Sequence, residues 1–376
     1  MNRSIDNKVD QRTTSGGLRV LIAAGGTGGH VFPGIAVAEE VKRREGYVLF
    51  LGTASGLEDR EVPKAGFSLE RIRVEKIKGV SAAGRLRAFI RGPGAVWSAL
   101  KKIRRFDPHI VLGAGGYVSG PAVVAANILR IPSVLLEQNS IPGLTNRMLG
   151  KLAQCSVIAF DEAKSYLPRS INLGNPIRTK IVHQLTGGSD GAKLKKNKKL
   201  TLLVLGGSQG ARPLNDIMAK MSPILNLRIY HQTGEKDYDW VVERYKRWNV
   251  DADVVPFIED MGEAYRVCDL IFCRAGATTI AELTLAGKPA ILVPFPHAAD
   301  DHQTANALAL ANRGAAICVP QSELTTQRMI QELKHLTLHD ETRQNMAVAM
   351  KALGRPEAAQ RVVDLLETRR KDGGES

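Results

Sequence analysis

Short runs of apolar residues alternate with stretches of helical spacing along the first half of the chain. The run LRVLIAA, Leu18–Ala24, is rich in branched side chains and ends in glycines, which is typical of a buried parallel strand. Residues 35–44 follow at helical spacing, and Pro33 suits the first turn of such a helix. Further strands are predicted at YVLFLGT, HIVLGAGG, SVLLEQN and CSVIAF. This alternation predicts a parallel sheet with helices on both faces.

The same alternation restarts near residue 200. GGSDGAKLKKNKK, Gly187–Lys199, is polar and charged and predicts a loop. LTLLVLGGSQG then repeats the opening theme, and LRIYHQTG, DVVPFI, LIFCRAGATT, PAILVPFP and AAICVP continue it. We therefore expect two similar α/β domains, joined near GNPIR. The predicted division is a disordered tail at 1–17, domains at 18–178 and 179–355, and a last helix at 356–376 that packs back on the first domain.

The charge of the chain predicts an anionic partner. Its 376 residues include 52 Lys and Arg against 38 Asp and Glu, a formal net charge of +14. Nucleic acid, anionic lipid and a phosphorylated substrate all fit such a charge. The polar N-terminus lacks the apolar stretch of a signal peptide, and no apolar run reaches the ~18 residues of a membrane span. These features predict a cytoplasmic protein that is able to touch a membrane surface.

The positive charge is concentrated between residues 71 and 105, where Glu75 is the only acid. Apolar residues, Trp97 among them, are interleaved with the basic ones, as in segments that lie on anionic lipid. An ordinary solvated helix face is the alternative interpretation. The basic residues are Arg71, Arg73, Lys76, Lys78, Arg85, Arg87, Arg91, Lys101, Lys102, Arg104 and Arg105.

Two glycine turns follow predicted strands. GGTGGH, Gly25–His30, lets the backbone approach a ligand closely, and the next helix offers free N–H groups to an anion or a polar sugar. It is not a dinucleotide fingerprint, because Val31 stands where the last glycine would be. GGSQGAR, Gly206–Arg212, is the same device in the second half. In the alternative interpretation, each turn only connects a strand to a helix and binds no ligand.

RAGATTIAE, Arg274–Glu282, is more informative. Ala277, Thr278 and Thr279 open a helix whose backbone amides and hydroxyls suit a diphosphate. Glu282 lies about one turn further on and suits a pair of ribose hydroxyls. In the alternative interpretation, a threonine caps the helix and Glu282 completes a capping box.

His30 is the histidine within a glycine turn and is a candidate general base, because a neutral imidazole beside a hydroxyl can take its proton. Its alternative is a structural histidine that caps the turn. PFPHAADDHQTANA resembles a metal site through His297, Asp300, Asp301 and His302. No second cluster completes that site, so we predict neither a metal nor a cofactor.

Taken together, these motifs resemble the MurG family of bacterial transferases. The resemblance spans roughly residues 18–311. It rests on GGTGGHVFPGIAVAEE, LGTASGLEDREVPKAGF, GAGGYVSGPAVVAA, LLEQNSIPGLTNRML, GNPIR, LVLGGSQGARPLND, FIEDM and CRAGATTIAELTLAGKPAILVPFPHAADDHQTANA. Several such strings in order are far more specific than any one of them.

The resemblance implies a GT-B fold, two Rossmann-like domains with parallel sheets facing across a cleft. It implies an inverting transfer of N-acetylglucosamine from UDP-N-acetylglucosamine to the muramyl 4-hydroxyl of undecaprenyl-diphosphate-linked muramyl pentapeptide, a step of peptidoglycan synthesis. The first domain would hold the acceptor and face the membrane, and the second would bind the UDP-sugar. The enzyme would be peripheral, at the cytoplasmic face of the plasma membrane.

The family's functional residues fall on matching positions of this chain. His30 falls on the proposed base, and Tyr117 and Glu137 lie in motifs near the acceptor side. Ile258 would meet uracil through its backbone. The donor contacts are Thr27, Gly28, Gly29, Asn139, Arg178, Ser208, Ile258, Ala277, Thr278, Thr279, Ile280, Ala281, Glu282 and Gln303.

One departure from the family pattern concerns the donor sugar. HAADDHQTAN is one residue longer than in some relatives between His297 and Asn306. Counting back from Asn306 selects Gln303 as the sugar contact, whereas counting forward from His297 selects His302. Both assignments stay open at the level of the sequence.

Two other classes of protein compete with this assignment. Another GT-B lipid glycosyltransferase, such as a diacylglycerol glycosyltransferase, or a UDP-N-acetylglucosamine 2-epimerase would share the fold. Epimerases also need acids for chemistry at C2, and the predicted cleft offers few. A nucleic-acid-binding protein fits the charge alone, but the zinc spacing, stacking aromatics and recognition helix of such proteins are missing. We therefore predict no nucleic-acid partner.

Overall fold

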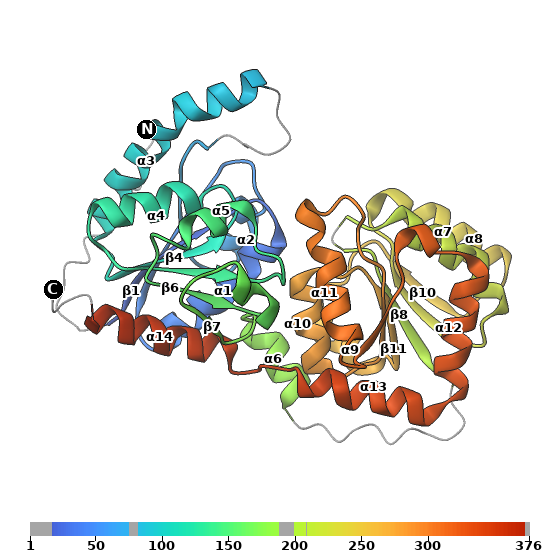
Figure 1. Cartoon of the computed structure of the whole chain (residues 1–376). Helices are drawn as coiled ribbons and strands as arrows, with labels where there is room; N and C mark the ends of the chain where they lie inside the picture. Colours follow the sequence, from blue (N-terminus) through green and yellow to red (C-terminus); the bar gives the residue numbers. More distant parts are fainter. Residues whose placement is uncertain (1–16, 75–81, 188–198, 208, 373–376) are drawn as a thin grey trace, which may run out of the picture.

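The computed structural model describes residues 17–74, 82–187, 199–207 and 209–372, and gives the backbone alone for 82–92, 371 and 372. These residues form two parallel sheets side by side, each with helices on both faces (Figure 1). We call the unit built on each sheet the first and the second domain. The prediction of two α/β domains with parallel sheets is confirmed. The N-terminal tail and most of the charged loop predicted before residue 200 lie outside the described residues.

The two sheets share one strand order. The first runs β3 (Ser68–Arg71), β2 (Tyr47–Gly52), β1 (Arg19–Ala24), β4 (Ile110–Gly115), β5 (Ser133–Glu137), β6 (Cys155–Ile158), β7 (Ser170–Asn172). The second runs β10 (Ala252–Val255), β9 (Arg228–Gln232), β8 (Thr201–Leu205), β11 (Leu270–Cys273), β12 (Ala290–Leu292), β13 (Ala316–Cys318). In both, the order reverses beside the first strand of the domain. Ligands of open parallel sheets bind at that point, beyond the carboxyl ends of the strands.

Alternate residues of the central strands fill two separate cores. In β1, Val20 and Ile22 face one core, whereas Leu21 and Ala23 face the other. The first core includes α1 (Gly28–Arg43) and α14 (Ala358–Asp372), and the second includes α3 (Ala82–Phe106) and α4 (Ser119–Ile128). This is the period of two that a strand buried on both faces requires.

The second domain is built in the same way. Leu202 and Val204 of β8 face a core shared with α7 (Arg212–Met221), α8 (Tyr238–Arg247) and α12 (Thr326–Leu338). Leu203 and Leu205 face a core with α9 (Met261–Val267), α10 (Ala277–Ala286), α11 (His302–Ala311) and α13 (Asp340–Ala352). The remaining helices are α2 (Glu58–Lys64), α5 (Leu144–Leu149) and α6 (Thr179–Thr186).

Helix α1 begins earlier than the pattern predicts. It starts at Gly28, with Thr27 as its N-cap, so that Pro33 lies inside the helix and not at its start. A proline there removes one hydrogen bond and crowds the residue four positions earlier. The group that the ring crowds is the backbone carbonyl of Gly29, in the first turn of the helix. The glycines of the motif therefore form the first turn of the helix.

Helix α14 returns from the second domain to the first and packs against α1 (Figure 1). Val362, Val363 and Leu366 are fully buried in the core of the first domain. Arg44, just after α1, donates hydrogen bonds to Glu40 at 2.7 Å and to Asp364 of α14 at 2.6 Å. Among the described helices, none is long and apolar enough to cross a membrane.

Candidate active site

The first glycine turn holds His30 by both its backbone and its ring. The amide of His30 donates to the Thr27 carbonyl at 3.1 Å. Its Nδ1 lies 3.2 Å from the Gly25 carbonyl oxygen and 3.4 Å from the Thr27 hydroxyl. A carbonyl only accepts, so the bond to Gly25 places the ring proton on Nδ1. The lone pair of a neutral ring is then on Nε2.

The surroundings of His30 favour its neutral form. Burial is the main cause that lowers its pKa below 6.5, and the His302 ring acts in the same direction. The carboxylates of Glu137 and Glu58 and the bond to Gly25 oppose this shift without reversing it. A neutral imidazole with a free Nε2 is the form that a general base requires.

A buried glutamate that the motif analysis did not single out anchors this turn. Glu58, at the start of α2, is fully buried and accepts from the amide of Gly26 at 2.8 Å. Its other oxygen accepts from the amide of Thr53 at 2.9 Å and from the Thr53 hydroxyl at 2.7 Å. Glu58 therefore ties the glycine turn to the end of the neighbouring strand β2.

The turn after β4 closes over the histidine. Gly115 and Gly116 have φ of +109° and +79°, which residues with side chains rarely adopt. A Cβ at Gly115 would lie 2.4 Å from Cδ2 of His30, and one at Gly116 would lie 2.3 Å from the Gly25 oxygen. The close approach of the two turns therefore depends on glycine. Tyr117 follows directly and is half-buried.

The start of α10 presents unpaired donors. Its N-cap is Gly276, and Ile280 is the first residue whose amide bonds back, to the Gly276 oxygen at 2.9 Å. The amides of Ala277, Thr278 and Thr279 precede it and have no intrahelical partner. The Thr278 hydroxyl is buried and has no hydrogen-bond partner in the described part of the chain. Three amides and one hydroxyl are thus available to an anion.

Glu282 is buried and does not cap this helix. Its Oε2 accepts from the hydroxyl of Tyr265 at 2.9 Å, so the capping-box interpretation is wrong. Burial raises the pKa of Glu282 to about 7, although the Tyr265 hydroxyl and the positive charge of Arg178 lower it. The carboxyl group thus changes charge near neutral pH.

Arg178 supplies a positive charge beside this helix. It is the N-cap of α6, and its guanidinium carbon lies 4.6 Å from the ring centroid of Phe32 in α1. No carboxylate forms an ion pair with it among the residues that the structure describes. Its charge is available to a ligand between α1 and α10.

The backbone of Ile258 is held by a glutamine that the motif search did not identify. Gln232, at the end of β9, accepts from the amide of Ile258 at 3.1 Å and donates to the Gly207 carbonyl at 2.9 Å. The Ile258 carbonyl, not its amide, is left for a base. Ser208 in the same glycine turn lies outside the described residues.

Glu137 organises the loop that carries Asn139. Its Oε1 accepts from the backbone and side-chain nitrogens of Asn139 at 3.0 and 3.1 Å. Its Oε2 accepts from the amide of Gly143 at 3.2 Å and from Asn146 at 2.9 Å. With its oxygens engaged by four donors, buried Glu137 shapes the loop and directs the Asn139 side chain towards the second domain.

The segment between His297 and Asn306 contains a tight turn ahead of helix α11. In this turn, Ala299–Asp301, the residues Asp300 and Asp301 have φ of +55° and +53°. Helix α11 runs without interruption from His302 and contains both candidates for the sugar contact, His302 and Gln303, together with Asn306. His302 bonds back to the Ala299 carbonyl at 2.7 Å, whereas Gln303 accepts from the amide of Phe295 and keeps its own NH₂ group to donate.

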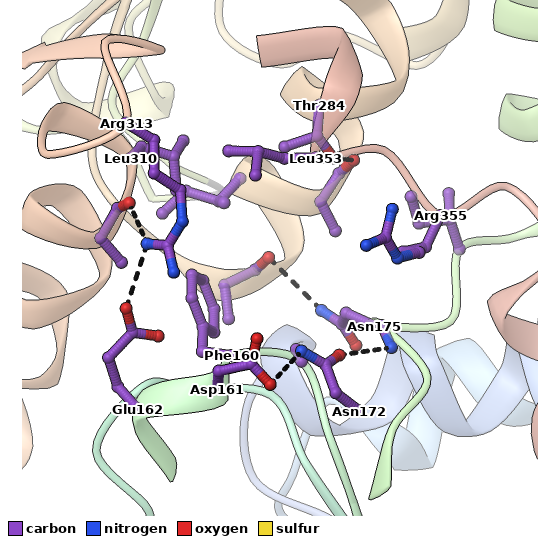
Figure 2. A pocket seen from close by; sticks show the side chains of 17 residues that line it. Phe160, Asp161, Glu162, Asn172, Asn175, Thr284, Leu310, Arg313, Leu353 and Arg355 are labelled. Carbon is purple, nitrogen blue, oxygen red and sulfur yellow. Dashed lines mark hydrogen bonds and ion pairs between the residues drawn. The ribbon is translucent and has the colours of Figure 1, made fainter. Parts of the chain in front are cut away.

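A cavity of about 110 Å³ lies between the domains, beside α10. Its lining includes Arg313, which donates to Glu162 of the other domain at 3.0 Å, and Asn175, which donates to the Ala277 carbonyl at 3.3 Å (Figure 2). Ala277, Ile280 and Ala281 border it, but His30, Glu282 and Gln303 do not. The cavity is therefore separate from the cluster around His30.

The chain matches family models for both of its domains. Residues 20–158 match the glycosyltransferase family 28 N-terminal domain, and residues 201–362 match the family 28 C-terminal domain. The UDP-N-acetylglucosamine–N-acetylmuramyl-(pentapeptide) pyrophosphoryl-undecaprenol N-acetylglucosamine transferase of Myxococcus xanthus (strain DK1622) is 43% identical over 357 residues, which is 93% of this chain and 92% of that protein.

Solved structures agree in fold. The crystal structure of Acinetobacter baumannii MurG superposes with a TM-score of 0.76 at 34% identity, over 93% of this chain and 99% of that one. A UDP-N-acetylglucosamine 2-epimerase shares the fold at 15% identity, with a TM-score of 0.63 over 93% of this chain and 95% of that one. The fold is therefore GT-B, as the motifs predict. On its matches in sequence, domains and structure, this chain belongs to the MurG family of glycosyltransferases.

Proposed function

We propose that this chain transfers N-acetylglucosamine from UDP-N-acetylglucosamine to the 4-hydroxyl of the muramyl sugar in undecaprenyl-diphosphate-linked muramyl pentapeptide. As a member of its family, it is a glycosyltransferase that uses a UDP-sugar. The observation that carries the proposal is the neutral His30, whose Nδ1 is bonded to the Gly25 carbonyl and whose Nε2 is left to accept a proton.

The donor diphosphate is assigned to the start of α10. Amides of Ala277, Thr278 and Thr279 and the unpartnered Thr278 hydroxyl supply hydrogen bonds, and Arg178 supplies a full charge. When the bond from the sugar C1 to the diphosphate oxygen breaks, its electron pair leaves with the diphosphate. Donors that are already in place stabilise this developing charge more strongly than they stabilise the ground state.

The remaining donor contacts follow from the geometry. Glu282 keeps one oxygen for ribose hydroxyls, since Tyr265 occupies the other. The Ile258 carbonyl is free to accept from the base. Gln303 is assigned to the sugar, because the side-chain NH₂ group of Gln303 is free to donate, whereas Nδ1 of His302 is bonded to the Ala299 carbonyl.

The acceptor approaches from the first domain. Its muramyl oxygen attacks the sugar C1 from the face opposite the diphosphate, so the configuration inverts, and Nε2 of His30 takes the hydroxyl proton. Tyr117 and the Glu137 loop border this side of the cleft. Thr27, Gly28 and Gly29 bring the first turn of α1 near the donor sugar.

A transfer assay tests the function directly. Labelled N-acetylglucosamine is offered as its UDP derivative together with a lipid-linked muramyl pentapeptide analogue, to the wild type and to His30→Ala. We expect product with the wild type and a loss of ~10²–10⁴ in kcat for the variant. No product with the wild type would reject the function. Near-normal transfer by the variant would reject the role of His30.

We also propose that the first domain rests on an anionic membrane surface, at the cytoplasmic face of the plasma membrane. Trp97 of α3 is 58% exposed, with the Lys101 ammonium 5.4 Å from its ring centroid. Helix α5 adds Leu144 and Met148, 56% and 68% exposed, and lies next to α4, which packs on α3 (Figure 1). Lys and Arg residues near such a surface contribute about 1 kcal/mol each. The side chains of residues 75–92, which hold part of the basic segment, lie outside the described residues.

Sedimentation with liposomes tests the membrane proposal. At low salt, liposomes with anionic lipid should pull the protein down and neutral liposomes should not. Trp97→Ala should weaken binding, whereas Trp248→Ala, which removes a tryptophan of similar exposure from the second domain, should not. Equal sedimentation with neutral liposomes would contradict the proposal.

The domain division that we propose is 18–178 for the acceptor and membrane side and 179–355 for the UDP-sugar; residues 1–16 of the predicted tail lie outside the described residues. The last helix, 356–376, is assigned to the first domain, and the burial of Val362 and Leu366 in that domain's core supports the assignment.

A further inference from the structure

Asn306 of the second domain is fully buried, yet its side chain bonds chiefly to the first domain. Its Oδ1 accepts from the amide of Ser140 at 2.8 Å and from the Ser140 hydroxyl at 2.9 Å. Its Nδ2 donates to Oδ1 of Asn139 at 3.2 Å and to the Ala275 carbonyl at 3.3 Å. A side-chain amide has two donor hydrogens and two acceptor positions, and Asn306 uses all four.

These bonds join the loops that carry the two halves of the site. Asn139 and Ser140 belong to the loop that Glu137 holds at the end of β5. Ala275 precedes Gly276, the N-cap of helix α10, whose first amides have no intrahelical partner. Asn306 itself lies three residues after Gln303, on the same face of α11.

We propose that Asn306 is a positioning residue for the transfer reaction, which sets the loop of Glu137 and Asn139 in the first domain against the start of α10 in the second. This inference rests on the proposed function. Only an amide fits this place. A carboxylate would turn two donors into acceptors that face the oxygens of Asn139 and Ala275, and an aliphatic side chain would leave the buried groups unpaired.

The expected effect falls on turnover and not on nucleotide binding. Asn306 makes no contact with the α10 amides, so UDP should bind Asn306→Ala within about threefold of the wild type. Displacement of reacting groups by about 1 Å can cost 10²-fold in rate. We expect kcat at saturating substrates to fall roughly 10- to 100-fold. Ser140→Ala, which leaves the backbone bond in place, should lose roughly 2- to 10-fold.

A double-mutant cycle in kcat shows whether Asn306 acts through its contact with Ser140 of the first domain or only through contacts within the second domain. The variants are Ser140→Ala, Asn306→Ala, the pair of them, and Asn312→Ala as a control. Asn312 is an exposed asparagine at the end of the same helix, and its replacement should leave kcat unchanged. If Asn306 acts through Ser140, the double variant should be no slower than Asn306→Ala. Small-angle X-ray scattering should show a larger radius of gyration for Asn306→Ala, whether or not acceptor is present.

The results that overturn the inference are distinct from those that overturn the function. A wild type that binds UDP-N-acetylglucosamine but forms no product rejects the proposed function. In that case the radius of gyration of Asn306→Ala still tests whether Asn306 holds the two domains together. The inference is rejected if the effects of Ser140→Ala and Asn306→Ala on kcat multiply independently, or if Asn306→Ala loses as much UDP affinity as it loses kcat. If Asn306→Ala does not fold, the isosteric Asn306→Asp takes its place. A wild-type kcat in Asn306→Asp would equally reject the inference.

Discussion

The buried carboxyl group of Glu282 predicts that donor binding depends on pH. Its pKa is about 7 in the ligand-free chain because burial disfavours the charged form. Ribose hydroxyls donate hydrogen bonds, so they favour the ionised form and should return the pKa towards its ordinary value of 4.5. Binding of the donor therefore releases a proton from part of the population, and the affinity falls as the pH falls through 7.

The size of the effect follows from linkage. A shift from about 7 to about 4.5 makes the affinity roughly tenfold weaker at pH 6 than at pH 8, or ~1.4 kcal/mol. Above pH 8 the carboxyl is already ionised in the free chain, and the dependence should level off. Glu282→Gln cannot ionise, so its affinity should be flat in pH and roughly tenfold weaker than the wild type at pH 8, since charge-assisted hydrogen bonds are lost.

Isothermal titration calorimetry with UDP-N-acetylglucosamine measures the donor affinity directly at each pH. The sugar nucleotide is preferable to UDP, whose terminal phosphate itself gains a proton near pH 6, at about the second pKa of a phosphate group. Glu243→Gln, which changes an exposed glutamate of α8, should retain the wild-type slope.

Tyr265→Phe gives a second and sharper check. It removes the hydroxyl that lowers the Glu282 pKa, so the midpoint should move to higher pH. A wild-type affinity that does not change between pH 6 and pH 8, or an equal slope in Glu282→Gln, would refute the reasoning.

Three further predictions concern the turn around His30. Because burial lowers the His30 pKa, the acid limb of kcat/KM for the acceptor, measured at saturating donor so that Glu282 stays ionised, should lie below pH 6.5 and be absent from the residual activity of His30→Gln; an acid limb above pH 7 would contradict this. Gly115→Ala should reduce kcat at least tenfold with unchanged UDP affinity, since the new Cβ would displace the His30 ring; normal kinetics would show that the contact is not tight. Glu58→Gln should lower the free energy of unfolding by about 1–3 kcal/mol in denaturant titrations, since its NH₂ group would replace one of the two acceptor oxygens and face the amide of either Gly26 or Thr53, donor against donor.

The hydrophobic pattern predicts the central strands well and the edges poorly. Strands such as β1 and β8 are buried on both faces, so they are continuous apolar runs with few competing interpretations. The edge strands Ser68–Arg71 and Ser170–Asn172 contain polar residues that remain partly exposed, and nothing in their sequences separates them from loops. Their pairing is set by neighbouring strands, which is tertiary information.

The same limit applies to the site. Glycine turns and a helix start are local, so GGTGGH and GATT are visible in the sequence. Glu58 acts on Gly26 across 32 positions, and Asn306 acts on Ser140 across 166. Each is a polar residue in an otherwise ordinary amphipathic helix, and its role depends on a buried partner that the fold supplies.

The N-terminal ends of α1 and α10 differ in how far a nearby acid neutralises the positive end of the helix dipole. This difference assigns their roles. Below the first turn, Glu58 accepts from Gly26 and places a carboxylate beneath the backbone, so an anion there would meet repulsion. The start of α10 has no acid in its first turn, keeps an unpartnered hydroxyl at Thr278, and lies near the charge of Arg178. The diphosphate is therefore better stabilised at α10. The first turn, with its neutral His30, suits the uncharged end of the donor, where the acceptor hydroxyl loses its proton.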